Sequence, residues 1–423
     1  MISNRVVVTG VGLVTCLSSK TEDSWSKVLN SCSGIRKISS FSTEDLPVCI
    51  GGEVITKEQG GDFNPNDYVT TPKDLKKYDK FILYGIAAAK QAILDSGILD
   101  FSGLDKDYVG VVIGSGIGGL PLIEKNSVLL DKSGHRRVSP LFIPSSLANL
   151  VSGNVSIEYG FTGPNDTNVT ACSTGVHSIA NACRIIKNNE AKVVISGASE
   201  GALCPVGISG FDSMRALSRR SEKPELASCP WDKKRDGFVM SDGAGILVLE
   251  EYNHAKNRGA KIYGEILGFG LSGDAHHIAA PHPQGDGALK AMERALKMSG
   301  KSPSDISYIN AHGTSTPLGD MAELNAVKRL FDSANAKYDF AISSTKSSLG
   351  HALGAAGSIE AILCLLAMRD SVAPPTINLE EPEEEAKIFN LVPKKPQDKK
   401  INCVMSNSFG FGGTNISIVM SKV

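Results

Sequence analysis

Runs of apolar residues alternate along the chain with segments of helical period. Residues 5–10 (RVVVTG) and 108–113 (YVGVVI) have the continuous apolar character of buried strands. Residues 74–97 place apolar side chains three and four positions apart, which predicts a helix with a basic start. The alternation of strands and helices predicts an α/β protein.

The second part of the chain repeats this plan from a strand that we expect to begin at Lys261. Residues 306–313 read as a strand that ends in a turn, and residues 343–368 read as strand end, turn and helix. Residues 401–420 predict two strands around a glycine-rich turn. The repetition predicts two related halves, at 1–255 and 256–423.

Cys172 lies at the centre of a segment of this kind, residues 166–201. β-prone residues precede it and apolar residues at helical spacing follow it, which predicts a strand-to-helix turn. The free N–H groups and partial positive charge of a helix N-terminus favour a thiolate and can hold an oxyanion. An isolated cysteine is more often a buried structural residue, so a catalytic interpretation depends on the other segments.

Composition limits the possible environments and partners. The 423 residues are 41% hydrophobic with a formal net charge of -1, which gives no strong attraction to nucleic acid or to a membrane surface. Nine scattered cysteines without a CxxC pair indicate reduced thiols. We found neither a signal peptide pattern nor an apolar stretch of membrane-spanning length, so we expect a cytoplasmic protein.

The glycine-rich run at 114–119 fits the spacing of a dinucleotide-binding loop and therefore allows a nicotinamide or flavin enzyme. No acidic residue ends a following strand about 20 residues later, so a packing role is favoured. A metal site is also disfavoured, because no further ligands at a recognisable spacing accompany His276, His277 and His282.

Four segments carry the candidate chemistry: TACSTG (170–175), NAHGTSTPLGD (310–320), STKSSLGHALGAAG (344–357) and NSFGFGGTN (407–415). Together they resemble the signature segments of the β-ketoacyl-acyl carrier protein synthases, the elongating condensing enzymes of fatty-acid synthesis. The similarity continues through WDKKRDGFVMSDGAG (231–245) and most of the chain, and it is closest to the free-standing type II form that elongates longer chains.

This resemblance implies a thiolase-like α/β fold, with two βαβαβαββ halves in five layers, α-β-α-β-α, and a homodimer. The implied reaction is a decarboxylative Claisen condensation of malonyl-acyl carrier protein with a medium- to long-chain acyl group, which lengthens the chain by two carbons. The acyl carrier protein would be the partner and would bring the phosphopantetheine arm, so the enzyme itself needs no cofactor. Nucleic acid and membranes are not expected partners.

The resemblance also implies the catalytic residues. Cys172 would carry the acyl group as a thioester, which lies close in energy to the incoming thioester. His312 and His351 would donate hydrogen bonds to the enolate that forms as carbon dioxide leaves. Lys346 would tune the electrostatics of the site.

Further residues match supporting positions of the family. The backbone N–H groups of Cys172 and Phe411 would form an oxyanion hole, and Phe409 and Phe411 would gate the acyl pocket. Thr314 and Thr316 match residues that bind phosphopantetheine, although turn-stabilising hydroxyls are an equally good interpretation.

Ile117 matches the residue at the floor of the acyl pocket, and Phe142 would enter the pocket from the partner subunit. A structural site for a monovalent cation or water is matched by Glu360, Asn310, Ser406 and Asn407. The basic residues that match the carrier-protein docking positions are Lys73, Lys76, Lys77, Arg136, Arg137 and Arg215.

Several relatives of this family are alternatives. The thiolase branch would have a second cysteine in the final glycine-rich turn, where GFGGTN has none, and the Cys-His-Asn branch would have Asn at the position of His351. A polyketide ketosynthase shares the motifs, and the free-standing length favours fatty-acid synthesis over it. Non-catalytic chain-length partners lack the cysteine that this chain keeps at Cys172.

Overall fold

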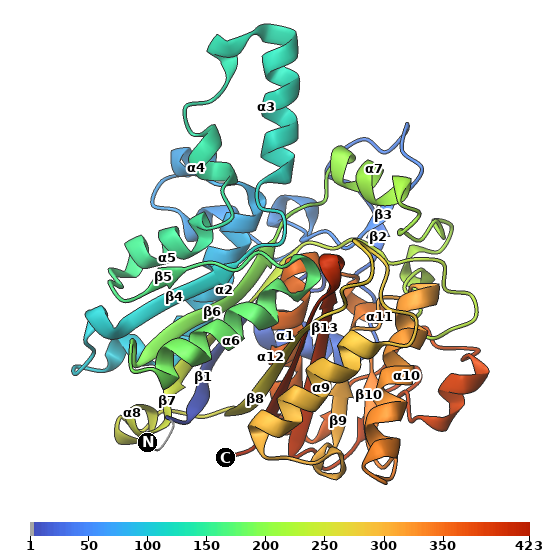
Figure 1. Cartoon of the computed structure of the whole chain (residues 1–423). Coiled ribbons are helices and arrows are strands. Elements are labelled where there is room, and N and C mark those ends of the chain that lie inside the picture. The colour runs from blue at the N-terminus through green and yellow to red at the C-terminus, as the bar shows by residue number, and fades with distance from the viewer. Residues whose placement is uncertain (1–3) are drawn as a thin grey trace.

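The computed structural model describes residues 4–423 and joins two halves of equal topology through one mixed sheet (Figure 1). The strands of the first half are β1 (Val6–Val14), β4 (Val109–Gly114), β5 (Asn165–Asp166), β6 (Val193–Glu200) and β7 (Gly243–Glu251). Those of the second half are β8 (Gly264–Gly273), β9 (Tyr308–Asn310), β10 (Ala341–Ser343), β13 (Cys403–Gly410) and β14 (Thr414–Ser421).

The spatial order of the strands is the same in both halves. It is β5-β4-β6-β7-β1 in the first half and β10-β9-β13-β14-β8 in the second, and antiparallel pairing of β1 with β8 joins them. In each half the second, third and fourth strands in the chain are parallel, and the first and fifth are antiparallel to their neighbours. The predicted duplication of the fold is confirmed.

Helices follow the first, second and third strands of each half. The first half contains α1 (Thr21–Leu29), α2 (Lys80–Ser96), α3 (Leu120–Ser133), α4 (Phe142–Ser146), α5 (Leu150–Tyr159), α6 (Thr174–Lys187), α7 (Pro205–Ser213) and α8 (Tyr252–Asn257). The second half contains α9 (Asp286–Ser299), α10 (Pro317–Ser333), α11 (Lys346–Leu349) and α12 (Ala356–Asp370). The α7 and α8 helices have no counterpart within residues 256–423. Two short ribbons complete the structure: β2 (Arg36–Lys37) with β3 (Ile50–Gly51), and β11 (Val372–Ala373) with β12 (Gln397–Asp398).

The five layers follow from the positions of three apolar cores, each of which lies between helices and strands. One core packs α2 and α5 against the outer face of the first half, and another packs α9 and α10 against the outer face of the second half. The central core contains α6 and α12, which pack on each other between the strands (Figure 1). Residues 356–368 of α12 are all buried, as expected for a helix that is apolar on every side. The predicted α-β-α-β-α arrangement is therefore confirmed.

The start of one helix and the start of one strand differ from the sequence prediction. The helix predicted at 74–97 begins only at Lys80, because Asp79 caps it and residues 72–77 form a separate 3₁₀ turn that starts at a proline. The strand expected from Lys261 begins at Gly264. Within residues 4–423, no helix has the length and apolar character that a membrane crossing requires.

Candidate active site

Cys172 lies in the turn that leads into α6, as the sequence predicts. Ala171–Ser173 form a 3₁₀ turn and α6 follows at once, whereas the strand before the turn ends earlier than expected, at Asp166. Ala171 has a left-handed backbone with φ of 49°. The Thr174 hydroxyl holds this turn by accepting from the Thr170 N–H at 2.9 Å and donating to the Ala171 carbonyl at 2.7 Å.

His351 precedes a turn of the same form in the second half. Leu353–Ala355 form a 3₁₀ turn before α12, and Leu353 has φ of 45°. The main chain of His351 is fixed on both sides, because its N–H donates to the Val239 carbonyl at 2.8 Å and its carbonyl accepts from the Ser241 N–H at 3.0 Å.

His312 follows the end of β9 and lies close to His351. The two imidazole rings are nearly perpendicular, with centroids 5.4 Å apart. Glu323 on α10 positions the His312 turn, since its carboxylate accepts from the N–H groups of His312 at 2.9 Å and Gly313 at 2.8 Å.

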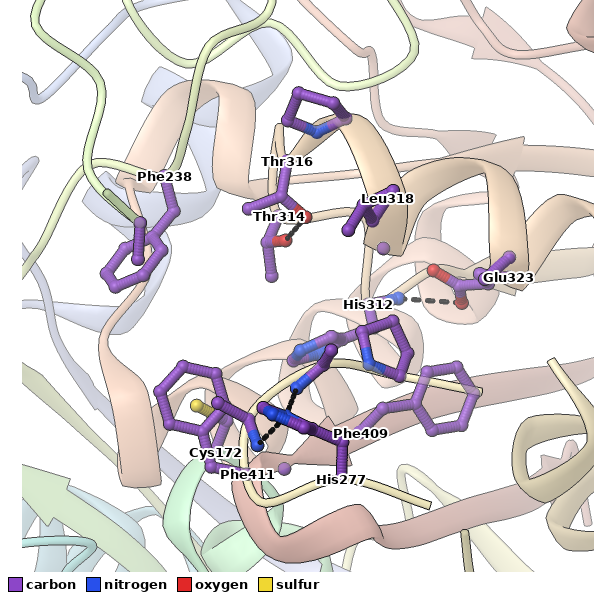
Figure 2. Close-up of a pocket in the computed structure, with 18 of the residues that line it drawn as sticks. Cys172, Phe238, His277, His312, Thr314, Thr316, Leu318, Glu323, Phe409 and Phe411 are labelled. Carbon is purple, nitrogen blue, oxygen red and sulfur yellow. Dashed lines mark hydrogen bonds between the residues drawn. The ribbon is translucent and has the colours of Figure 1, made fainter. Parts of the chain in front are cut away.

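These turns open into one cavity of about 530 Å³. Its wall includes most of the residues predicted to contact substrate: Cys172, His312, Thr314, Thr316, His351, Phe409, Phe411 and Arg215. The cysteine is 8% exposed, and the ring of Phe409 packs edge-on against His312. The hydroxyls of Thr314 and Thr316 are 3.0 Å apart on the far side of the cavity (Figure 2).

Lys346 lies behind this cavity in a buried ion pair. It begins α11, is 2% exposed and pairs with Glu360 of α12. Asn310 of β9 stands beside Ser406 of β13 in the sheet register. Asn407 donates to Glu323 at 3.0 Å and accepts from Ser417 at 2.7 Å.

Burial sets the protonation states of the central groups. It raises the pKa of the Cys172 thiol to about 12, although the charge of Lys346 acts in the opposite direction. Burial, and then the positive charge of Lys346, lowers the pKa of both His312 and His351 well below the ordinary value. The imidazoles are neutral at pH 7. Burial therefore favours the protonated thiol and opposes the thiolate that the helix N-terminus favours.

The acyl-pocket candidates lie outside this cavity. Ile117 follows β4 and is 37% exposed, and Phe142 begins α4. Neither side chain lines the cavity that contains Cys172.

The candidate docking residues are all exposed but are distributed over three places. Arg215 lines the cavity, while the others lie in 3₁₀ turns before α2 and after α3: Lys73, Lys76, Lys77, Arg136 and Arg137. Lys77 pairs with Asp74 at 2.5 Å. The α3 helix projects from the rest of the chain (Figure 1).

The glycine-rich run at 114–119 is engaged by the protein itself. The Gly116 N–H donates to the carboxylate of Glu200 at 2.8 Å, and the Ile117 N–H donates to it at 3.3 Å. The amide groups that would hold a dinucleotide pyrophosphate therefore point at a buried acid. A packing role fits this loop better than cofactor binding.

Sequence reasoning missed three residues around the site. Glu323 and Glu200 are fully buried acids that bind main-chain N–H groups, and Phe238 packs edge-on on His351 with centroids 5.3 Å apart. The sequence signal that could have identified the two acids is an acidic residue within or at the end of an apolar segment. Glu200 is an example, because it ends the run VVISGASE.

Comparison with known proteins gives matches over the whole chain. Residues 3–255 match the family described as "Beta-ketoacyl synthase, N-terminal domain", and residues 263–380 match "Beta-ketoacyl synthase, C-terminal domain". The chain is 48% identical to the 3-oxoacyl-[acyl-carrier-protein] synthase 2 of Coxiella burnetii over 423 residues, which is 100% of both proteins. It is 43% identical to the protein of that name from Staphylococcus aureus over 421 residues, 99% of each.

Solved structures of similar proteins have the same fold. A β-ketoacyl synthase from Burkholderia phymatum matches with a TM-score of 0.90 and 31% identity, over 99% of this chain and 100% of that one. A ketosynthase of a type II polyketide system, in complex with its acyl carrier protein and bound to the hexaketide, matches with a TM-score of 0.89 and 30% identity over 100% of both chains.

Proposed function

The chain belongs to the β-ketoacyl synthase family, and we propose that it condenses malonyl-acyl carrier protein with an acyl group held on Cys172. It is an acyltransferase of fatty-acid synthesis, a 3-oxoacyl-[acyl-carrier-protein] synthase that lengthens medium- to long-chain acyl groups by two carbons. The observation that carries the roles of individual residues is that Cys172, His312 and His351 line one cavity.

In the first step the Cys172 sulfur attacks the acyl thioester of the carrier protein. A carbon–sulfur bond to the enzyme forms, the bond to the carrier thiol breaks, and the proton of the Cys172 thiol is transferred to the departing sulfur. Main-chain N–H groups at Cys172 and Phe411, which lie at the same end of the cavity, are the donors for the oxyanion (Figure 2). Phe409 and Phe411 gate the entry of the acyl chain, because a glycine follows each of them and lets the turn move.

In the second step the malonyl group loses carbon dioxide and its carbon attacks the acyl carbonyl. The carboxylate carbon–carbon bond breaks, and its electrons pass into an enolate whose oxygen accepts hydrogen bonds from His312 and His351. The new carbon–carbon bond forms as the bond to the Cys172 sulfur breaks, and the thiolate recovers a proton from the solvent, which is the one proton that the overall reaction consumes. Neutral imidazoles suit this role, since they donate a hydrogen bond without readily giving up the proton.

Lys346 keeps these groups in the required states without lining the cavity. Its charge lowers the pKa values of both histidines and of the Cys172 thiol. Three nearby buried oxygens lack hydrogen-bond partners within residues 4–423: Asn310 Oδ1, Ser406 Oγ and Glu360 Oε2. With Asn407 beside Ser406 in β13, they are suitable ligands for a structural monovalent cation or a water, which would stabilise the charge of Glu360.

The acyl carrier protein is the partner that delivers both thioesters. Arg215 lies at the cavity, where the acidic surface of a carrier protein would be attracted, and Thr314 and Thr316 are placed to bind the phosphopantetheine arm. Lys73, Lys76, Lys77, Arg136 and Arg137 would extend this docking surface.

A homodimer would complete the acyl pocket at Ile117 with Phe142 of the second subunit. Large apolar side chains are exposed around the edge strand β5 and on the neighbouring helices: Ile143 (59%), Leu147 (46%), Ile157 (79%) and Val169 (56%). The nine cysteines are all free thiols, which suits a reducing compartment such as the cytoplasm. We place the boundary between the halves at residues 255 and 256, within α8.

Polyketide synthesis is the nearest alternative activity. The sequence relatives at 43% identity or more are named as 3-oxoacyl synthases, whereas the polyketide ketosynthase that the fold matches is 30% identical. A non-catalytic chain-length partner is also disfavoured, because the cysteine and both histidines share the cavity.

The direct test is a reaction of the purified protein with one acyl-acyl carrier protein and malonyl-acyl carrier protein. We expect a 3-oxoacyl-acyl carrier protein two carbons longer than the starting chain, identified by the mass of the carrier protein, together with carbon dioxide. Free malonyl-carrier protein without an acyl donor controls for decarboxylation alone. Absence of the lengthened product with every acyl chain would refute the proposed function.

A further inference from the structure

Glu200 is a buried carboxylate that the reaction described above does not use. It is the last residue of β6, is 0% exposed, and takes part in no ion pair within residues 4–423. Four groups donate to its oxygens: the Ser115 hydroxyl at 2.9 Å and the N–H groups of Gly116 at 2.8 Å, Ile117 at 3.3 Å and Gly354 at 3.0 Å.

The donors come from both halves of the chain. Gly116 and its neighbours belong to the loop after β4, while Gly354 belongs to the turn between His351 and α12. One carboxylate oxygen, Oε2, accepts from both glycines. Glu200 therefore connects the loop of the first half directly to the histidine turn of the second half.

The Cys172 turn packs against the same point. A Cβ atom on Gly116 would stand 2.7 Å from Glu200 Oε2, 3.2 Å from the Ala171 carbonyl and 3.3 Å from the Gly354 Cα. The nucleophile turn, the histidine turn and the carboxylate thus meet around a glycine that has no space for a side chain.

Burying a carboxylate at this position costs folding free energy, so its presence requires a role for its hydrogen bonds. Burial without a cation penalises the charged form and raises the pKa of Glu200 to about 7. Removing it would leave the main-chain N–H groups of Gly116, Ile117 and Gly354 without their acceptor, and the Gly354 N–H is buried. The acid is therefore best explained by the geometry it imposes on the two turns.

We propose that Glu200 is a positioning residue that fixes the His351 turn relative to the Cys172 turn, and that condensation depends on it more than acylation does. Acylation uses the cysteine turn and the oxyanion donors. Condensation also requires His351 to reach an enolate that faces the acyl group on Cys172, so it is more sensitive to a shift between the turns. This inference rests on the proposed function.

The two oxygens of Glu200 make a conservative variant informative. Oε1 accepts from the Ser115 hydroxyl and, at the longest distance, from Ile117. In Glu200→Gln the amide nitrogen can occupy this side and donate to Ser115, while the amide oxygen keeps both glycine N–H groups. Glu200→Ala removes all four hydrogen bonds.

The experiment measures both half-reactions separately in each variant. Acylation of Cys172 is followed by intact mass with acyl-acyl carrier protein, and condensation by single turnover of the acylated enzyme with malonyl-acyl carrier protein. In Glu200→Ala we expect condensation to fall about 10- to 100-fold while acylation stays within about fivefold of the wild type. Glu200→Gln should restore most of the condensation rate.

Glu53→Ala is the matched control. Glu53 is also buried and accepts from the main-chain N–H groups of Ser39 at 2.7 Å and Ser40 at 2.9 Å, but these hydrogen bonds reach neither the Cys172 turn nor the His351 turn. In Glu53→Ala the ratio of the condensation rate to the acylation rate should equal that of the wild type. Equal losses of both half-reactions in Glu200→Ala, or a ratio that matches the Glu53→Ala control, would overturn the proposal.

A second variant covers the case in which Glu200→Ala does not fold. In Gly354→Ala the carboxylate stays, but the new Cβ would lie 2.4 Å from the Gly116 nitrogen and 2.7 Å from Glu200 Oε2, which forces the turns apart. We expect the same selective loss of condensation, and an unchanged ratio would overturn the inference. A wild-type protein that forms no acyl adduct on Cys172 would instead refute the proposed function.

Discussion

The turns at Ala171–Ser173 and Leu353–Ala355 occupy equivalent places in the two halves of the molecule. Each begins with a left-handed residue, at φ of 49° and 45°, and each leads into one of the two central helices. Cys172 is the middle residue of the first turn and Gly354 is the middle residue of the second. The backbone is repeated, but the reactive side chain is present only once.

The difference shows how a duplicated fold becomes an asymmetric site. Gly354 leaves the space that Gly116 and Glu200 fill, so the second turn cannot carry a side chain there. Its chemistry comes instead from His351, three residues earlier, and from the ion pair behind it. In the proposed reaction the first half supplies the nucleophile, and the second half supplies the hydrogen-bond donors and the positive charge.

Removing the thiol has the largest expected effect on this division of roles. Cys172→Ala should abolish both acylation and condensation, because no other residue of the cavity wall has a thiol. Cys183→Ala on α6, the helix that follows the Cys172 turn, is buried away from the cavity and should keep both reactions. The two variants are compared by intact mass and by product formation, and an acyl adduct in Cys172→Ala would contradict the assignment.

Removing either histidine should separate the two steps. In His312→Ala and His351→Ala we expect acylation of Cys172 to persist and malonyl decarboxylation to fall by about 10²–10⁴-fold, since each loses one donor to the enolate. Carbon dioxide release from malonyl-acyl carrier protein measures this. His254→Gln, on α8 and outside the cavity wall, is the control. Normal decarboxylation in both cavity variants would show that the donors lie elsewhere.

The buried ion pair of the second half should make a large contribution to stability. Lys346→Met leaves the Glu360 carboxyl unpaired in the interior, where it must either stay charged or take up a proton, and we expect the free energy of unfolding to fall by about 3–5 kcal/mol. The double variant Lys346→Met, Glu360→Leu should be more stable than that single variant, because it removes both charges. Urea denaturation of the three proteins checks this, and a double variant that is less stable than Lys346→Met would contradict it.

The protonated Cys172 thiol of the first half predicts that the rate of its alkylation depends on pH. Since burial raises the pKa of Cys172 to about 12, the thiolate fraction, and with it the alkylation rate by iodoacetamide, should rise about tenfold per pH unit between pH 7 and pH 9. Peptide mapping of Cys172 at a series of pH values measures the rate. A rate that levels off below pH 8 would show that the resting residue is already a thiolate.

The local alternation of strands and helices predicted the duplicated fold, and the resemblance of four segments to one enzyme family predicted the residues that meet in the cavity. The α12 helix is apolar on every side, which indicates a central helix. The reactive residues follow the ends of strands in three segments: TACSTG, NAHGTSTPLGD and STKSSLGHALGAAG. The capping role of Asp79, the protonated thiol and the contacts of Glu200 and Glu323 depend on segments far apart in the chain. Local periodicity contains no information about such contacts.

The most direct test of the account follows the mass of the enzyme through both steps. The protein is incubated with saturated acyl-acyl carrier proteins of graded length, the adduct is mapped by peptide, and malonyl-acyl carrier protein is then added. We predict one acyl group on Cys172 that disappears as a 3-oxoacyl-acyl carrier protein two carbons longer forms. An adduct on another residue, or an acyl group on Cys172 that malonyl-acyl carrier protein does not remove, would contradict the account.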